Sequence, residues 1–193
     1  MSELAAIVQA HVDDLAPGLH DLRSDAPTLE RWARCIVSRF QAGGRLLVAG
    51  NGGSAAQAEH LAAEFVGRYS SERRPLPAMS LSADPAILTA LVNDYGGDKV
   101  FARQVEAQAR PCDVVLLLST SGRSANAIEA AHAARRIGTL TLAFTGPAPN
   151  PLADSCDDAL CAAGPHPAAV QELHLVALHA LCACIDHVLG VAA

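Results

Sequence analysis

Charged residues are scarce in this sequence, and the charge balance is acidic. Only 18% of the 193 residues are charged and 51% are hydrophobic, a composition that excludes a disordered chain and is sufficient for one domain with a full core. The formal net charge of −6 disfavours a nucleic-acid-binding surface. We therefore expect a single domain over residues 1–193 with no nucleic-acid partner.

Zinc-binding cysteine spacing, a signal peptide and a membrane-spanning segment are also missing. The six cysteines show no zinc spacing, since Cys182 and Cys184 are too close together for a CxxC knuckle. The first 15 residues are amphipathic and acidic, unlike a signal peptide, and no apolar run reaches membrane-spanning length. We interpret the six cysteines as reduced thiols and expect a cytoplasmic protein with no membrane partner.

Nucleotide-binding fingerprints are absent as well. The phosphate-loop pattern GxxxxGK[ST] occurs nowhere, and the segment GNGGSA that starts at Gly50 has glycines at its first, third and fourth positions. A dinucleotide fingerprint requires glycines at the first, third and sixth positions. A dinucleotide enzyme is therefore disfavoured, although Asp84 follows a predicted strand, where a ribose-binding acid would stand.

Apolar segments alternate with segments of helical spacing along most of the chain. Predicted strands cover residues 45–50, 76–81, 113–119, 139–146 and 158–164. Predicted helices cover 4–22, 28–41, 55–66, 85–94, 99–109, a segment that ends at Gly138, and 167–189. This alternation predicts an α/β, flavodoxin-like, three-layer sandwich with a mostly parallel five-stranded sheet. Because residues 1–43 precede every strand, we expect their helices to lie outside the sheet core or against another subunit.

Two serine-glycine loops follow predicted strands and precede predicted helices. The first, GNGGS, covers residues 50–54, and the second, STSGRS, covers residues 119–124. Free backbone N–H groups, a helix dipole and hydroxyl donors all suit an anion, and glycine allows its close approach. Ordinary capping turns remain the alternative for either loop alone, but two such loops at the carboxyl ends of parallel strands favour a phosphate ligand.

Several polar residues lie on predicted helices near these loops. His60 and Glu64 are four residues apart and project from one helix face, which suits a metal site, a base with its partner, or a solvated surface pair. His179 lies in an apolar helix, where a buried structural histidine is the simpler interpretation. Asn93 and Asp94 end a predicted helix, where they are also compatible with a plain turn.

Five segments in order make a family resemblance specific. AGNGGSAAQAEHLAAEFVGR, LTALVNDYG, VFARQVEA, DVVLLLSTSGRSANAIEAA and VQELHLVALHALC together resemble the sedoheptulose 7-phosphate isomerase (phosphoheptose isomerase) family, a branch of the sugar isomerase (SIS) domain proteins. The resemblance covers residues 28–187 and implies a ketose–aldose isomerase acting through an enediol. It also implies a homotetramer with active sites between subunits. The alternative is a non-catalytic SIS module that binds a sugar phosphate or a protein partner as a regulator.

The resemblance also implies the site residues. It places one Zn²⁺ per subunit on His60, Glu64, Gln171 and His179, with Glu64 as the catalytic base and His179 as its partner acid. It places the sugar phosphate on Asn51, Gly52, Gly53, Ser54, Asn93, Asp94, Ser119, Thr120, Ser121, Ser124 and Gln171. One point conflicts with simple geometry, because Gln171 and His179 lie about 12 Å apart along a straight helix, with directions that differ by about 80°. Either the start of that helix is distorted or the site draws on two chains.

Overall fold

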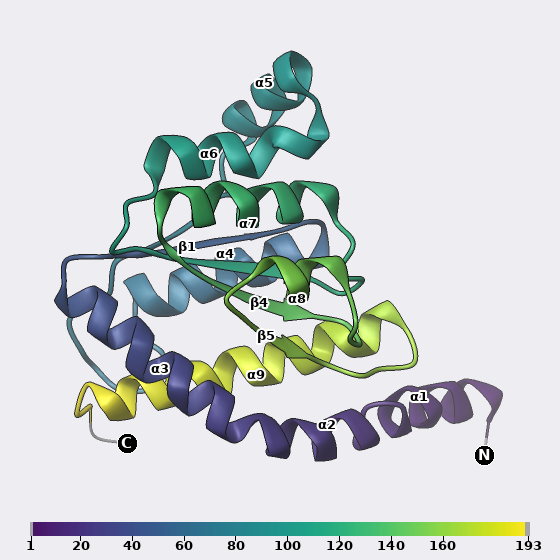
Figure 1. Ribbon diagram of the computed structural model, residues 1–193. Helices are drawn as coiled ribbons and strands as arrows, with labels where there is room; N and C mark the ends of the chain where they lie inside the picture. The colour runs from purple at the N-terminus through teal and green to yellow at the C-terminus, as the bar shows by residue number, and fades with distance from the viewer. Residues whose placement is uncertain (1, 192–193) are drawn as a thin grey trace.

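The computed structural model describes residues 2–191 and contains a five-stranded, fully parallel sheet between two layers of helices (Figure 1). The sheet order is β2-β1-β3-β4-β5. The strands are β1 (Leu46–Gly50), β2 (Ala78–Ser80), β3 (Val114–Ser119), β4 (Leu140–Thr145) and β5 (Asp158–Cys161). All five predicted strands and the flavodoxin-like order are confirmed. The ends of the expected domain, Met1 and residues 192–193, lie outside the described residues.

Successive strand residues point into two separate cores, one on each face of the sheet. Leu46 and Val48 face the layer formed by α3 (Ala26–Gln41), α4 (Gly53–Val66) and α9 (Pro167–Val188). Leu47 and Ala49 face the layer formed by α6 (Val100–Gln108), α7 (Ala125–Ile137) and the short α8 (Pro151–Ser155). Because both faces are covered, β1 and β3 are buried along their whole length, which explains their continuous apolar runs.

The N-terminal helices differ from the prediction of one helix over residues 4–22. The chain forms α1 (Glu3–Asp13) and α2 (Ala16–Leu22), followed by a 3₁₀ turn at Arg23–Asp25. Pro17 lies in the first turn of α2, where its ring and missing N–H are tolerated, whereas inside one continuous helix they would break a backbone hydrogen bond.

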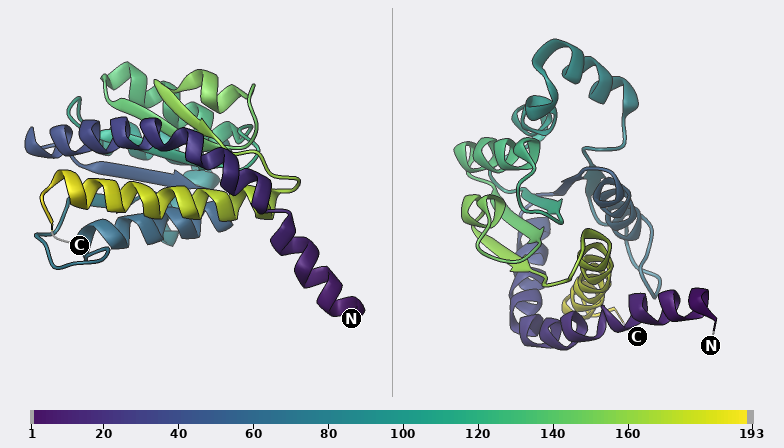
Figure 2. Two further views of the ribbon diagram at one scale, coloured as in Figure 1. Left: turned by 90° about the horizontal axis from the view of Figure 1, so that it is seen from below. Right: turned by 90° about the vertical axis from the view of Figure 1, so that its right-hand side faces the viewer.

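Residues 1–43 were expected outside the sheet core, but α3 contributes to it. Six α3 residues are buried in the core: Leu29, Trp32, Ala33, Ile36, Val37 and Phe40. By contrast, α1 has no buried residue, and Figure 2 shows it projecting from the body of the molecule. Its Leu4, Ile7, Val8 and Val12 side chains are exposed.

The prediction that no apolar segment reaches membrane-spanning length is wrong for the long helix α9. Its 22 residues are long and apolar enough to cross a membrane by length and composition alone. Half of its apolar window is buried, and residues such as Leu173, Leu178 and Ile185 pack in the core beside α3. Its apolar composition is therefore that of a core helix.

The helix α5 (Pro85–Tyr95) and a 3₁₀ turn at Gly97–Lys99 complete the fold.

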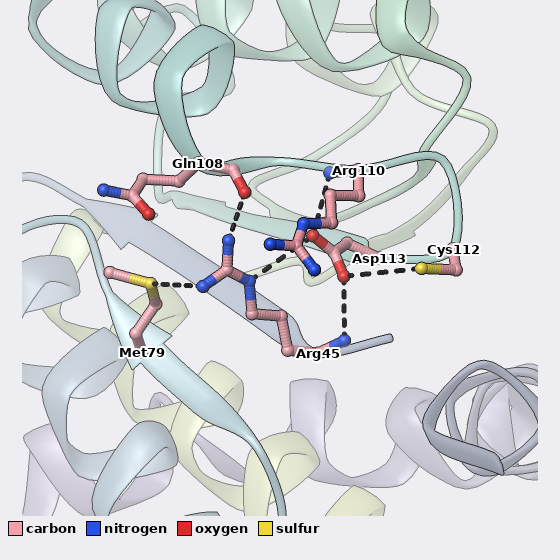
Figure 3. Close-up of polar contacts among 6 residues, drawn as sticks. All are labelled: Arg45, Met79, Gln108, Arg110, Cys112 and Asp113. Atoms are coloured by element: carbon pink, nitrogen blue, oxygen red, sulfur yellow. Dashed lines mark hydrogen bonds and ion pairs between the residues drawn. The ribbon is translucent and has the colours of Figure 1, made fainter. Parts of the chain in front are cut away.

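At the opposite end of the sheet from the serine-glycine loops, Asp113 joins the starts of β1 and β3 (Figure 3). It accepts hydrogen bonds from the backbone N–H groups of Arg45 (2.9 Å) and Arg110 (2.9 Å), and its side chain is only 1% exposed. The Arg45 guanidinium lies 3.5 Å from the same carboxylate, so a buried acid is paired there.

His174 on α9 is fully buried and neutral. Its Nε2 lies 2.9 Å from the Thr145 carbonyl oxygen, which can only accept, so Nε2 carries the proton. Its Nδ1 is buried without a partner among the described residues, and a proton there would create an unpaired buried charge. Burial accordingly lowers the pKa of His174 to about 4.

We expect this histidine to make the fold acid-sensitive. An unfolded histidine titrates near pH 6.5, so stability present above that pH is lost as the pH falls toward 4, by about 3 kcal/mol in total. Replacement by glutamine retains an N–H donor but does not titrate. Urea unfolding of wild type and His174→Gln at pH 7, 5.5 and 4.5 should show a shallower loss in the variant. Parallel losses would contradict this assignment.

Candidate functional site

The two serine-glycine loops meet at the point where the strand order reverses. β1 is flanked by β2 on one side and β3 on the other, and Gly50 is in register with Leu118. The loops that leave β1 and β3 therefore emerge side by side at the carboxyl edge of the sheet. In open α/β sheets this switch point is where ligands bind.

The loop of residues 119–124, here called the serine loop, brings three hydroxyl groups together. Ser119 Oγ lies 2.9 Å from Ser124 Oγ and 3.4 Å from Ser121 Oγ. Ser124 is the N-cap residue of α7, but its side chain makes no capping hydrogen bond, so its hydroxyl faces the other serines. Gly122 has φ +60° and lies against the Asn150 side chain, a position where a Cβ has no room. This arrangement of donors at a helix N-terminus suits a phosphate.

A pair of carboxamides joins the loop that follows β1 to the start of α7, the helix that follows the serine loop. Asn51 and Asn126 exchange two hydrogen bonds of 2.9 Å each. Asn126 lies in the first turn of α7 and was not predicted as a site residue, because an asparagine near a helix start is usually read as part of a cap. The pair fixes the two loops relative to each other across the switch point.

Glycines in the same loop allow close approach of other groups. Gly52 precedes α4 with φ +55°, a conformation that disfavours other residues. A Cβ on Gly53 would meet the Gln171 carboxamide oxygen at 2.2 Å, so Gln171 lies directly against this loop. Ser54, by comparison, is only 5% exposed and is the least accessible of the predicted substrate contacts in this loop.

His60 and Glu64 of α4 and His179 of α9 come together in the structure and are here called the His–Glu–His cluster. Their ligand atoms all lie within 4.8 Å of one another. His60 Nε2 is 3.1 Å from both Glu64 Oε1 and His179 Nε2, although His179 is 119 residues away in the sequence. The side chains of His60 and Glu64 are 41% and 23% exposed, so the cluster is open to solvent.

The cluster has the chemistry of a metal site. Two imidazole nitrogens and one carboxylate oxygen form a His₂Glu set, which holds zinc in catalytic sites and leaves a fourth position open. His179, for which burial was the simpler interpretation, is partly exposed and faces His60. The ring of Tyr69 lies 5.7 Å from the His179 ring and covers one side of the cluster.

The structure does not bring Gln171, Asn93 or Asp94 into the His–Glu–His cluster. α9 is continuous from Pro167, so no distortion of its start brings Gln171 toward His179. Asn93 donates to Asp94 at 2.8 Å and both are exposed on α5. Within residues 2–191, no hydrogen bond joins Asn93 or Asp94 to the other candidate residues.

Known proteins resemble this chain over most of its length. The family model of the SIS domain matches residues 11–146. The phosphoheptose isomerase of Streptomyces coelicolor is 52% identical over 179 residues, which cover 93% of this chain and 78% of the relative. That of Roseiflexus sp. is 47% identical over 168 residues, covering 87% and 85%.

Solved structures give the same result. The phosphoheptose isomerase of Neisseria gonorrhoeae superimposes with a TM-score of 0.88 at 37% identity, covering 95% of this chain and 99% of that one. The enzyme from Francisella tularensis gives 0.87 at 30% identity, covering 97% and 100%. A fold, a switch-point site and sequence similarity over nearly the whole chain thus lead to one conclusion: the chain belongs to the phosphoheptose isomerase family of SIS-domain proteins.

Proposed function

We propose that this protein converts sedoheptulose 7-phosphate to D-glycero-D-manno-heptose 7-phosphate, the first step of nucleotide-activated heptose biosynthesis. The observation that carries the proposal is that the structure holds both the His–Glu–His cluster, on α4 and α9, and a group of serine hydroxyls at the switch point of the sheet. One part is suited to acid–base chemistry and the other to a phosphate, which are the two requirements of a phosphosugar isomerase.

The serine loop would hold the terminal phosphate. Ser119, Ser121 and Ser124 supply hydroxyl donors, and the start of α7 supplies backbone N–H groups. The remaining sugar contacts are proposed at Asn51, Gly52, Gly53, Ser54, Asn93, Asp94, Thr120 and Gln171. Binding the phosphate at one end of the sugar would leave the other end, with its carbonyl, free for the proton-transfer groups.

The reaction moves one proton between neighbouring carbons. The Glu64 carboxylate removes a proton from C1 of the ketose while the C2 oxygen gains one, which gives an enediol. Return of a proton to C2 and loss of the C1 hydroxyl proton then give the aldose, so atoms and electrons balance without a redox partner. His179, 3.1 Å from His60, is the proposed partner acid for the oxygen atoms.

The proposed cofactor is one Zn²⁺ per subunit. His60, Glu64 and His179 fit such an ion by their donor set and mutual distances, and Gln171 is proposed as a further ligand on the family resemblance. When bound, zinc polarises the carbonyl and the neighbouring hydroxyl. The metal content of the purified protein tests this directly, with about one zinc ion per chain expected.

A non-catalytic SIS module is the competing function. Such a protein would bind a phosphosugar, or a protein partner, through the serine loop but would have no need for Glu64 and His179 to face each other. Their proximity in the structure favours the enzyme. A protein that binds the phosphosugar but contains no metal and forms no aldose would support the module instead.

We also propose a homo-oligomer, a tetramer with active sites between subunits. The exposed apolar side chains of α1, from Val12 at 59% to Leu4 at 75% exposure, favour burial against another chain. Light scattering at micromolar concentration should give a mass close to four chains, and a stable monomer would contradict the proposal.

We propose a cytoplasmic location as well. The six cysteines are all free in the structure, which supports such a location.

A further inference from the structure

Arg73 is a buried arginine in the loop that joins α4 to β2. Its side chain is only 4% exposed, and its Nε donates to Asp186 Oδ1 at 2.7 Å. The guanidinium also donates to carbonyl oxygens at the end of α4, to Glu64 at 2.7 Å and to Phe65 at 2.9 Å. One side chain therefore connects the end of α4 to α9.

The carbonyl groups at the end of α4 explain why an arginine is needed there. The last four carbonyls of a helix have no partner within the helix. The Ala63 carbonyl accepts from the N–H of Gly67 at 2.8 Å, but that of Glu64 depends on Arg73. The positive charge is also favourable at this end of the helix dipole. Arg73 thus fixes the backbone of Glu64, the same residue whose carboxylate belongs to the His–Glu–His cluster.

On α9, the partner of Arg73 lies on the same face as the cluster histidine. Asp186 follows His179 by seven residues, almost two full helical turns, so both side chains project in nearly the same direction. At the other end of α9, Gln57 of α4 donates to the Gln171 backbone carbonyl at 2.7 Å. The two helices are therefore joined on both sides of the cluster, by Gln57 before it and by Arg73 after it.

We propose that Arg73 is a positioning residue that sets the distance between α4 and α9, and with it the geometry of the His–Glu–His cluster. This inference builds on the proposed function, since the cluster is the proposed metal and acid–base site. The loop that carries Arg73 also carries Tyr69, whose ring lies against His179, so the same segment acts on both helices. Lysine cannot replace Arg73, because a single ammonium group cannot reach a carboxylate and several carbonyls at once.

The test is Co²⁺ binding by purified wild-type and Arg73→Lys proteins, followed by the visible absorption of the bound ion. We expect Arg73→Lys to bind Co²⁺ about 10- to 100-fold more weakly, as is common when a supporting partner of metal ligands is lost. The shape of the absorption bands should also change, since they report ligand geometry. Unchanged affinity and unchanged bands in a folded variant would overturn the proposal.

Two arginines provide matched controls for general destabilisation. Arg74→Lys alters the adjacent, exposed arginine. Arg45→Lys weakens the other pair between an arginine and a buried aspartate, at the far end of the sheet, and should lower the melting temperature without changing Co²⁺ affinity. If Arg45→Lys weakens Co²⁺ binding as much as Arg73→Lys, the effect is one of stability alone and the proposal fails.

Two further measurements keep the proposal testable if Arg73→Lys does not fold or if wild type binds no Co²⁺. Asp186→Asn leaves the carbonyl contacts of Arg73 in place and should weaken Co²⁺ binding several-fold, whereas wild-type affinity would count against the proposal. A crystal structure of Arg73→Lys or Asp186→Asn requires neither metal nor substrate. A change beyond about 0.5 Å in the 3.1 Å separation of His60 Nε2 and His179 Nε2 would support positioning, and an unchanged separation would refute it. This readout is independent of whether the proposed isomerase activity is found.

Discussion

Replacing Glu64 by glutamine is expected to lower turnover by about two to four orders of magnitude, the usual contribution of general acid–base catalysis. Glutamine has nearly the same size and still offers an oxygen atom to a metal, but it has no basicity. Because the serine loop is untouched, binding of the phosphosugar should largely survive. The measurement is kcat and KM for sedoheptulose 7-phosphate, with the variant saturated with zinc.

Zinc saturation separates two roles of Glu64. If the carboxylate only anchors the ion, excess zinc should restore a rate close to that of wild type, and the base would have to be found elsewhere, with Asp94 or His179 as the next candidates. Glu59→Gln is the matched control, because Glu59 is an exposed carboxylate on the same helix and outside the cluster. It should retain wild-type turnover.

The second large effect is expected from the serine loop. Replacing Ser119 and Ser121 together by alanine should raise KM by about two to four orders of magnitude, since hydrogen bonds to a charged group contribute about 1.5–3 kcal/mol each. Turnover at saturation should change much less, because the proton-transfer groups are intact. Ser38→Ala, on the exposed side of α3, serves as the control.

The ligand itself provides a second check on this assignment. Calorimetric affinities for sedoheptulose 7-phosphate and for the sugar without phosphate should differ strongly in wild type and little in the double variant. If the double variant binds the phosphorylated sugar as tightly as wild type does, the phosphate lies elsewhere on the protein.

The sheet and its two loops could be predicted because their signals are local. The buried run that ends at Ser119 is recognisable as a parallel strand, and a serine-glycine loop after it indicates an anion site wherever the strands are parallel. The pair His60–Glu64 was also visible as a helical spacing. His179 joins them only through the packing of α9 on α4, which no local pattern specifies.

Contacts between distant segments were therefore the part that sequence patterns could not supply. Asn126 lies in a predicted helix start, yet its role follows from its reciprocal pairing with Asn51, 75 residues earlier. Arg73 lies in a loop with no pattern of its own, and its partner Asp186 is 113 residues away. The position of α3 was missed for the same reason. The apolar face of residues 26–41 predicts that the helix is buried on one side, but it does not specify which surface covers that side.

The most direct test of the central claim is the formation of an aldose from sedoheptulose 7-phosphate by the zinc-loaded protein, followed by ¹H NMR. We predict that a new anomeric proton signal of the heptose 7-phosphate grows to an equilibrium level with wild type, and grows about 100- to 10,000-fold more slowly with Glu64→Gln. A folded, zinc-loaded wild-type protein that binds the substrate but produces no anomeric signal would contradict the isomerase and identify a phosphosugar-binding module.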